Sequence, residues 1–220
     1  MPEVDLMKSY PKTNREDLIT IRRQVSDADR ATAQQFGEEY FDGPRHLGLG
    51  GYYYDKKYFG PVVQDMIEFY SLKRDSRILD VGCGKGFMMK DFMDALPGSS
   101  VYGIDISKYC QEHSLIEAKS NILLGSCERI PFPDNHFDLV VSIATIHNVD
   151  LEGVKKSLRE IVRVSRGNNY YIKVNGYRTD QERQNLEDWN LVAKTILHVE
   201  QWEQLFEETG YQGEYSFFST

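Results

Sequence analysis

The stretch ILDVGCGKGF, residues 78–87, decides the fold of this chain. It begins as a short apolar run that contains Asp80, and glycines follow at Gly82, Gly84 and Gly86 before a helical pattern begins. Glycines at a turn between a strand and a helix let the backbone bend sharply and approach a ligand closely. Three alternating glycines exceed what a tight turn needs, so the stretch predicts a ligand site at the end of a strand.

The spacing of these glycines distinguishes between classes of nucleotide site. Dinucleotide binding requires G-x-G-x-x-G, and the last glycine of that pattern is replaced here by Phe87. The observed spacing, G-x-G-x-G, therefore disfavours NAD and FAD. A phosphate-binding Walker loop is also disfavoured, because Lys85 is not followed by Ser or Thr.

Short apolar runs alternate with helical patterns from residue 77 onward. We expect strands at 77–82, 101–106, 121–126, 138–144 and 169–175, with helices at 86–96, 108–119, 151–165, 180–195 and 199–209. Strands that alternate with helices predict an α/β fold with a doubly wound, mostly parallel sheet, whose ligand lies at the carboxyl ends of the strands. A last strand at 213–219 is expected as an antiparallel edge.

The first part of the chain has a different pattern. Residues 13–42 are charged and predict one or two partly exposed helices, and the Gly-rich, aromatic stretch at 46–55 predicts a loop. Pro61 is expected to open the next helix at its first turn. We therefore divide the chain into an N-terminal helical and loop lid, residues 1–60, and a ligand-binding domain, residues 61–220.

Charge and cysteine content exclude several classes of protein. The 220 residues carry a formal net charge of −8, which disfavours nucleic acid as a partner, and the basic stretch at 155–166 has the spacing of a solvated helix face. The cysteines form no C-x-x-C pair, so neither disulfides nor a metal site is expected. No signal-peptide core is present, and the most apolar run, residues 137–146, is about half of a membrane span. We expect a cytoplasmic protein without a membrane partner, and homo-oligomerisation is left open.

Three segments resemble, in order and spacing, the successive motifs of class I S-adenosylmethionine-dependent methyltransferases. They are ILDVGCGKGF, VYGIDIS at 101–107 and IPFPDNHFDLVVSIATIHNV at 130–149. The resemblance covers residues 77 to about 175. It implies a Rossmann-like methyltransferase fold of seven strands, one of them antiparallel, with S-adenosyl-L-methionine as cofactor and S-adenosyl-L-homocysteine as product. Only six strands are apparent here, so the last strand is missing or formed differently.

The resemblance also implies a set of cofactor-binding residues. The backbone of Gly82, Cys83 and Gly84 would line the methionine part, and Asp80 would orient that loop or meet the amino group through water. Asp105 would accept hydrogen bonds from both ribose hydroxyls, although a carboxylate there could instead cap the following helix.

Further residues are assigned to the two ends of the cofactor. Ile106 would pack on the adenine, and Ser126 and Cys127 stand where the family often has an acidic residue, which leaves backbone contacts to the adenine. Below the methionine and sulfonium we place Ser142 and Ala144. The tyrosine run contributes Tyr53 as a contact to the sulfonium or to the cofactor carboxylate; the alternative is that these rings only pack the N-terminal helices.

The methyl acceptor is not specified by these motifs. His147, after the fourth strand, is a candidate general base, and a structural histidine is the alternative. We expect methyl transfer to an O or N atom of a small metabolite, such as a sugar or a phosphorylated intermediate. A protein or RNA methyltransferase is the alternative enzyme, and a cofactor-binding, non-catalytic subunit is the alternative from another class.

Overall fold

The structure, a computed structural model, describes residues 3–12 and 20–218. Its strands are β1 (Arg77–Val81), β2 (Ser100–Asp105), β3 (Ile122–Leu124), β4 (Leu139–Ile143), β5 (Tyr170–Tyr177), β6 (Leu197–His198) and β7 (Glu214–Phe218). Its α-helices are α2 (Asp27–Ala33), α3 (Glu38–Phe41), α4 (Lys56–Phe69), α5 (Phe87–Ala95), α6 (Lys108–Glu112), α7 (Leu151–Val164), α8 (Asp180–Trp189) and α9 (Val199–Thr209).

All strands form one parallel sheet in the order β3-β2-β1-β4-β5-β6, and β7 pairs with β5 as well. The doubly wound α/β fold is thereby confirmed. The predicted antiparallel direction of the last strand is wrong, because β7 runs parallel to β5 with Tyr171 beside Glu214 and Asn175 beside Phe218. Helix α9 carries the chain back along the sheet before β7 begins, as a parallel connection requires. The short strand β6 pairs only with the last two residues of β5.

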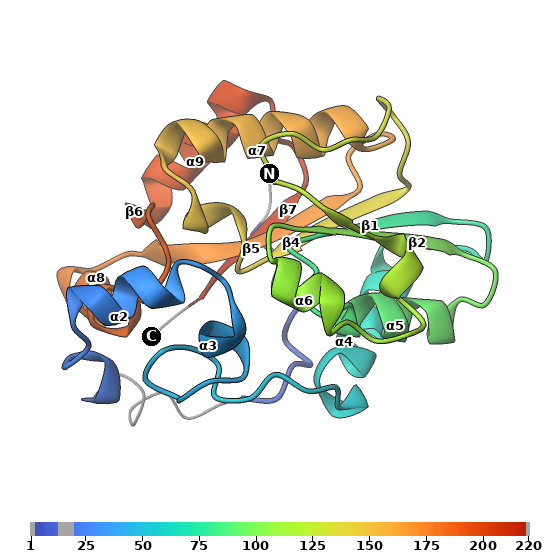
Figure 1. Cartoon of the computed structure of the whole chain (residues 1–220). Helices are drawn as coiled ribbons and strands as arrows, with labels where there is room; N and C mark the ends of the chain where they lie inside the picture. Colours follow the sequence, from blue (N-terminus) through green and yellow to red (C-terminus); the bar gives the residue numbers. More distant parts are fainter. Residues whose placement is uncertain (1–2, 13–19, 219–220) are drawn as a thin grey trace.

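Helices cover both faces of the sheet (Figure 1). On one face α7 and α9 pack through buried residues such as Leu158, Ile161 and Trp202. On the other face α4 and α5 pack through residues such as Met66 and Phe92. The carboxyl ends of β1, β2 and β4 are left to the loops that build the site. Among the described residues, none of the helices has the length and apolar character needed to span a bilayer.

Three helix boundaries differ from the prediction: helix α6 ends at Glu112 rather than at residue 119, and the start of α4 and the end of α8 differ for local reasons. Helix α4 begins at Lys56 and contains Pro61, because Asp55 caps its start by accepting a hydrogen bond from the Lys57 backbone. The boundary between residues 60 and 61 therefore lies inside a helix. Helix α8 ends at Trp189, since the side chain of Asn190 accepts hydrogen bonds from the next turn of backbone.

Residues 3–7 pack against the sheet. The backbone N–H of Val4 donates to the carbonyl of Tyr215 at 2.9 Å, so this segment extends the sheet beyond β7. Leu6 and Met7 are buried in the core between the sheet and α4. The helices expected within 13–42 fall partly outside the described residues. Within the described part, residues 20–22 are helical, and the short helices α2 and α3 follow (Figure 1).

Candidate functional site

The glycine loop after β1 adopts a backbone conformation that favours glycine. Gly82 and Gly84 have φ angles of +85° and +54°, in the left-handed region that penalises a side chain. A Cβ atom at Gly82 would lie 1.9 Å from Oγ1 of Thr145, and one at Gly84 would lie 3.0 Å from the ring of Tyr52. The loop is therefore packed from both sides, and its glycines allow close approach rather than a simple turn.

Asp105, the last residue of β2, is bonded to this loop. Its carboxylate accepts a hydrogen bond from the Gly84 backbone at 2.7 Å and another from the Ser107 backbone at 2.8 Å. The following helix is capped instead by Ser107, whose hydroxyl accepts from the Cys110 backbone. Burial raises the pKa of Asp105. Because Ser107 already caps this helix, the interpretation of Asp105 as the helix cap is not needed.

Asp80 and Cys83 lie beneath the loop in a poorly solvated environment. Asp80 is 4% exposed, and burial together with the nearby charge of Asp105 raises its pKa to about 8. Burial also raises the pKa of the Cys83 thiol, so this cysteine stays protonated and is not a nucleophile. Both side chains are therefore buried at the end of β1.

The residues predicted for the adenine and sulfonium ends lie at neighbouring strand ends. Ile106, just after β2, is 61% exposed although apolar, and the hydroxyl of Ser126, just after β3, accepts from the Glu128 backbone. Ser142 is buried in β4 and donates to the Val81 carbonyl at 3.2 Å, so it joins β4 to β1. The residues that complete this set are Cys127, which contacts the hydroxyl of Ser157, and Ala144, which has a φ of +56° just beyond β4.

The three tyrosines of the aromatic run point in different directions. Tyr53 is 76% exposed, and the hydroxyl of Tyr54 donates to Asp91 at 2.6 Å. Tyr52 lies against Gly84 in the glycine loop, and its ring centroid is 4.4 Å from that of Phe87, which the Tyr54 ring also meets at 5.9 Å. The structure therefore places Tyr53, the predicted contact, in solvent and its neighbour Tyr52 at the site.

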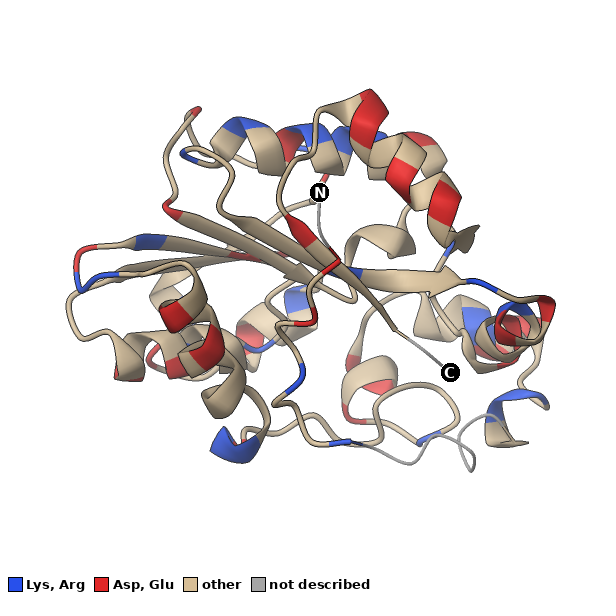
Figure 2. Ribbon diagram, turned by 180° about the vertical axis from the view of Figure 1, so that it is seen from behind, with Lys and Arg blue, Asp and Glu red and all other residues tan. Residues whose placement is uncertain are grey.

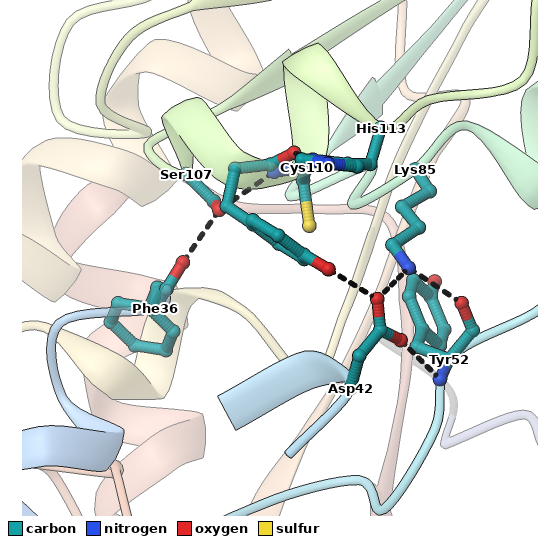
Figure 3. A network of polar contacts seen from close by, with 8 residues as sticks. Phe36, Asp42, Tyr52, Lys85, Ser107, Cys110 and His113 are labelled. Carbon is teal, nitrogen blue, oxygen red and sulfur yellow. Dashed lines mark hydrogen bonds and ion pairs between the residues drawn. The ribbon is translucent and has the colours of Figure 1, made fainter. Parts of the chain in front are cut away.

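A polar network that the sequence did not reveal joins the N-terminal part to the loop (Figure 3). The carboxylate of Asp42 accepts from Lys85 Nζ at 2.5 Å, from the Tyr109 hydroxyl at 2.6 Å and from the Tyr52 backbone at 2.8 Å. The only signal available beforehand was a lysine inside a glycine loop. Lys85 also donates to the Tyr52 carbonyl at 2.9 Å.

Comparisons with known proteins agree with this geometry. Residues 79–172 match the family model described as a methyltransferase domain. This match includes the glycine loop and Asp105. Residues 79–172 are therefore similar to the methyltransferase family, and we call them the methyltransferase domain.

Curated relatives of the methyltransferase domain act on different substrates. Sterol 24-C-methyltransferase ERG6B of Gibberella zeae is 33% identical over 100 residues, which make up 42% of this chain and 26% of that protein. The tRNA (carboxymethyluridine(34)-5-O)-methyltransferase of Arabidopsis thaliana is 30% identical over 151 residues, 64% of this chain and 33% of that protein. The chain thus spans about a quarter to a third of the length of these relatives.

Solved structures share the methyltransferase fold. The YcgJ protein of Bacillus subtilis superposes with a TM-score of 0.54 at 22% identity, covering 67% of this chain and 66% of that one. A putative sarcosine dimethylglycine methyltransferase from Galdieria sulphuraria gives 0.53 at 19% identity, covering 69% and 58%. At these sequence identities the similarity shows a shared fold and nothing about substrates.

His147 of the methyltransferase domain is enclosed rather than open to an acceptor. It is 4% exposed, and burial lowers its pKa to about 3. Its Nδ1 accepts a hydrogen bond from the Asn175 backbone at 3.2 Å, so in the neutral ring the proton sits on Nε2. A general base needs an unprotonated nitrogen that faces its substrate. In His147 the unprotonated nitrogen is Nδ1, which already accepts the hydrogen bond from the Asn175 backbone. The arrangement favours the structural alternative over the predicted base.

Two buried carbonyl oxygens lie near His147 at the ends of β4 and β5. The Oδ1 atoms of Asn148 and Asn175 are buried and have no hydrogen-bond partner within residues 3–12 and 20–218. Asn175 itself is 1% exposed, and its backbone carbonyl accepts from the indole of Trp202 at 2.8 Å. Such oxygens are acceptors, so they suit a ligand that donates a hydrogen bond.

Basic and acidic residues alternate over the helices of the molecule (Figure 2). The basic helix α7 lies beside acidic residues: Lys155 pairs with Glu208 at 3.0 Å and Arg163 pairs with Glu160 at 2.6 Å. No group of three or more metal-ligating side chains occurs in the part of the chain that the structure describes.

Proposed function

We propose that this chain transfers a methyl group from S-adenosylmethionine to a small metabolite, with an amine nitrogen favoured over a hydroxyl oxygen. The observation that carries the proposal is the bond between the Asp105 carboxylate and Gly84, because it joins a ribose-type acceptor to a close-approach glycine loop.

The residues present fit the cofactor. A carboxylate offers about four lone-pair positions, so Asp105 keeps capacity for ribose hydroxyls beside its two backbone donors. The backbone of Gly82 and Gly84 would hold the methionine part, and exposed Ile106 would cover the adenine. S-adenosylmethionine would supply an electrophilic methyl group on a sulfonium sulfur.

The acceptor class follows from the uncharged groups near β4 and β5. His147 is neutral at pH 7, and its unprotonated nitrogen is bonded to backbone, so an acceptor that needs no deprotonation is favoured. A neutral amine meets this condition and can donate to the Asn175 carbonyl oxygen. Transfer to tRNA, the activity named for one relative, is disfavoured by the net charge of −8.

The test is label transfer from methyl-labelled S-adenosylmethionine. Separate reactions would contain an amine metabolite fraction, a hydroxyl metabolite fraction, tRNA and soluble protein, with Asp105→Ala as the inactive control. Label in the amine fraction supports the proposal. Label confined to tRNA or protein contradicts the acceptor class. Binding of S-adenosylhomocysteine without any label transfer supports a non-catalytic subunit instead.

A further inference from the structure

The Tyr52 ring lies among the residues assigned to the cofactor. Its edge is at the surface of Gly84, where an added Cβ atom would be 3.0 Å away. Burial raises the pKa of its hydroxyl well above the ordinary value, and the charged neighbours that add to this effect include Asp80 and Asp105. The Tyr52 ring therefore lies against the glycine loop, near enough to Asp80 and Asp105 to feel their charges.

The chain before Tyr52 covers the same region, and we call residues 36–52 the cover segment. The backbone carbonyl of Phe36 accepts a hydrogen bond from the Ser107 hydroxyl at 2.6 Å (Figure 3). Burial raises the pKa of Tyr40 to about 12, and Asp105 is among the charges that act on it. The cover segment thus contacts Ser107, two residues after Asp105, and its Tyr40 lies near enough to Asp105 to feel its charge.

Asp42 holds the cover segment in this position. It bonds at once to Lys85 in the glycine loop, to Tyr109 on α6 and to the backbone of Tyr52. Burial alone would raise the pKa of Asp42, but the hydrogen bonds from Lys85 and Tyr109 outweigh it and lower the pKa to about 2. One carboxylate therefore links three elements that are far apart in the sequence.

We propose that Tyr52 occupies the cofactor site from within the chain, and that cofactor enters only after the Asp42 contacts break and the cover segment moves away. This inference rests on the proposed function of the site. A ring against Gly84 takes the space that a ligand needs for close approach to that backbone. The apparent affinity for cofactor is then reduced by the fraction of molecules that are open.

In the alternative arrangement, Tyr52 does not exclude the cofactor but packs against it once it is bound. The two arrangements make opposite predictions. If the cover segment competes with the ligand, weakening it raises affinity and speeds association. If the cover segment closes on the ligand, weakening it lowers affinity.

The first experiment compares binding of S-adenosylhomocysteine to the full chain and to Asp42→Ala by stopped-flow fluorescence and calorimetry. We expect Asp42→Ala to bind about tenfold more tightly and to associate about tenfold faster, since the open fraction rises. Asp94→Ala is the matched control, because it also removes an aspartate–lysine pair, with Lys90 at 2.7 Å, outside the cover segment. Tyr109→Phe removes one contact to Asp42 and keeps the ring, so a smaller change in the same direction is expected if Asp42→Ala folds poorly.

The second experiment measures amide hydrogen exchange of residues 36–52 with and without saturating S-adenosylhomocysteine. Displacement predicts faster exchange of the Tyr52 amide on binding, because its bond to Asp42 is lost. Unchanged or slower exchange, or weaker binding by Asp42→Ala, overturns the inference while leaving the proposed function intact. Absence of binding by every variant overturns both.

Discussion

The backbone nitrogen of Gly84 lies 2.7 Å from Oδ2 of Asp105. This bond ties the loop after β1 to the end of β2, so the two parts of the ligand site are held in a constant relation. The same carboxylate also accepts a hydrogen bond from the Ser107 backbone N–H. Asp105 therefore serves the fold and the site at once, and its replacement should affect both.

Asp105→Ala should weaken S-adenosylhomocysteine binding by at least about tenfold and lower the free energy of unfolding by about 1–3 kcal/mol, because two backbone donors lose their acceptor. Calorimetry and urea denaturation measure the two effects. Asp138→Ala is the control, since Asp138 accepts from the Arg77 backbone at 2.9 Å at the opposite end of β1. It should lose stability and keep its affinity. Unchanged affinity in Asp105→Ala would remove the ribose role.

Asp80 should make the protein less stable as the pH rises. Its pKa is 3.8 in the unfolded chain and about 8 in the folded protein, raised by burial and by Asp105. Between these values the folded state binds more protons, so the free energy of unfolding falls with rising pH by up to about 1.4 kcal/mol per unit. Denaturation at pH 5 and pH 8 should show the decline in the wild type and a weaker decline in Asp80→Asn. Equal slopes in both proteins would contradict the raised pKa.

His147 should act in the opposite pH range. Burial lowers its pKa from 6.5 to about 3, so the unfolded chain takes up a proton first and stability is lost as the pH falls below about 6.5. His147→Ala should reduce stability at pH 7 by about 1–3 kcal/mol, because the Asn175 N–H loses its acceptor, and should show a flatter decline below pH 6.5.

The activity of the same variant separates the two roles of His147. With the true acceptor, turnover should fall less than about fivefold once stability is corrected for, whereas a general base typically contributes 10²–10⁴-fold. A loss of a hundredfold at unchanged cofactor affinity would restore the catalytic role.

Leu6→Ala should destabilise the protein by about 2–5 kcal/mol, the usual cost of truncating a buried leucine. Leu6 is 3% exposed and packs in the core that α4 and α5 share. Ile21→Ala is the comparison, since Ile21 is 41% exposed and should cost much less. Thermal denaturation measures both. Deleting residues 1–45 should accordingly impair folding, and a fully stable deletion would show that this segment is only a lid.

The sequence predicted the parts of the fold that local patterns encode. The runs that became β1 to β5 are short and apolar, and the glycine loop follows one of them. The direction of β7 was not predictable in this way, because it depends on where α9 returns the chain. The two residues of β6 carry no pattern of their own.

In the candidate site, too, local patterns predicted single residues but not the contacts between distant segments. Motif resemblance predicted the glycines and Asp105, whose bond the structure shows directly. Asp42 was missed because its partners Lys85 and Tyr109 are 43 and 67 residues away, and nothing local indicates that they meet. The tyrosine run was assigned to Tyr53 rather than Tyr52, since three adjacent rings give no sign of which one faces inward.

The pairing of Val4 with Tyr215 has a consequence for biosynthesis. During translation Val4 emerges from the ribosome 211 residues before its partner exists. Until β7 follows, the apolar side chains of Leu6 and Met7 have an incomplete sheet to pack against. Contacts of such sequence separation slow folding and leave nascent chains open to aggregation. We therefore expect Val4, Leu6 and Met7 to lack their native contacts with the end of the sheet until synthesis has passed Tyr215.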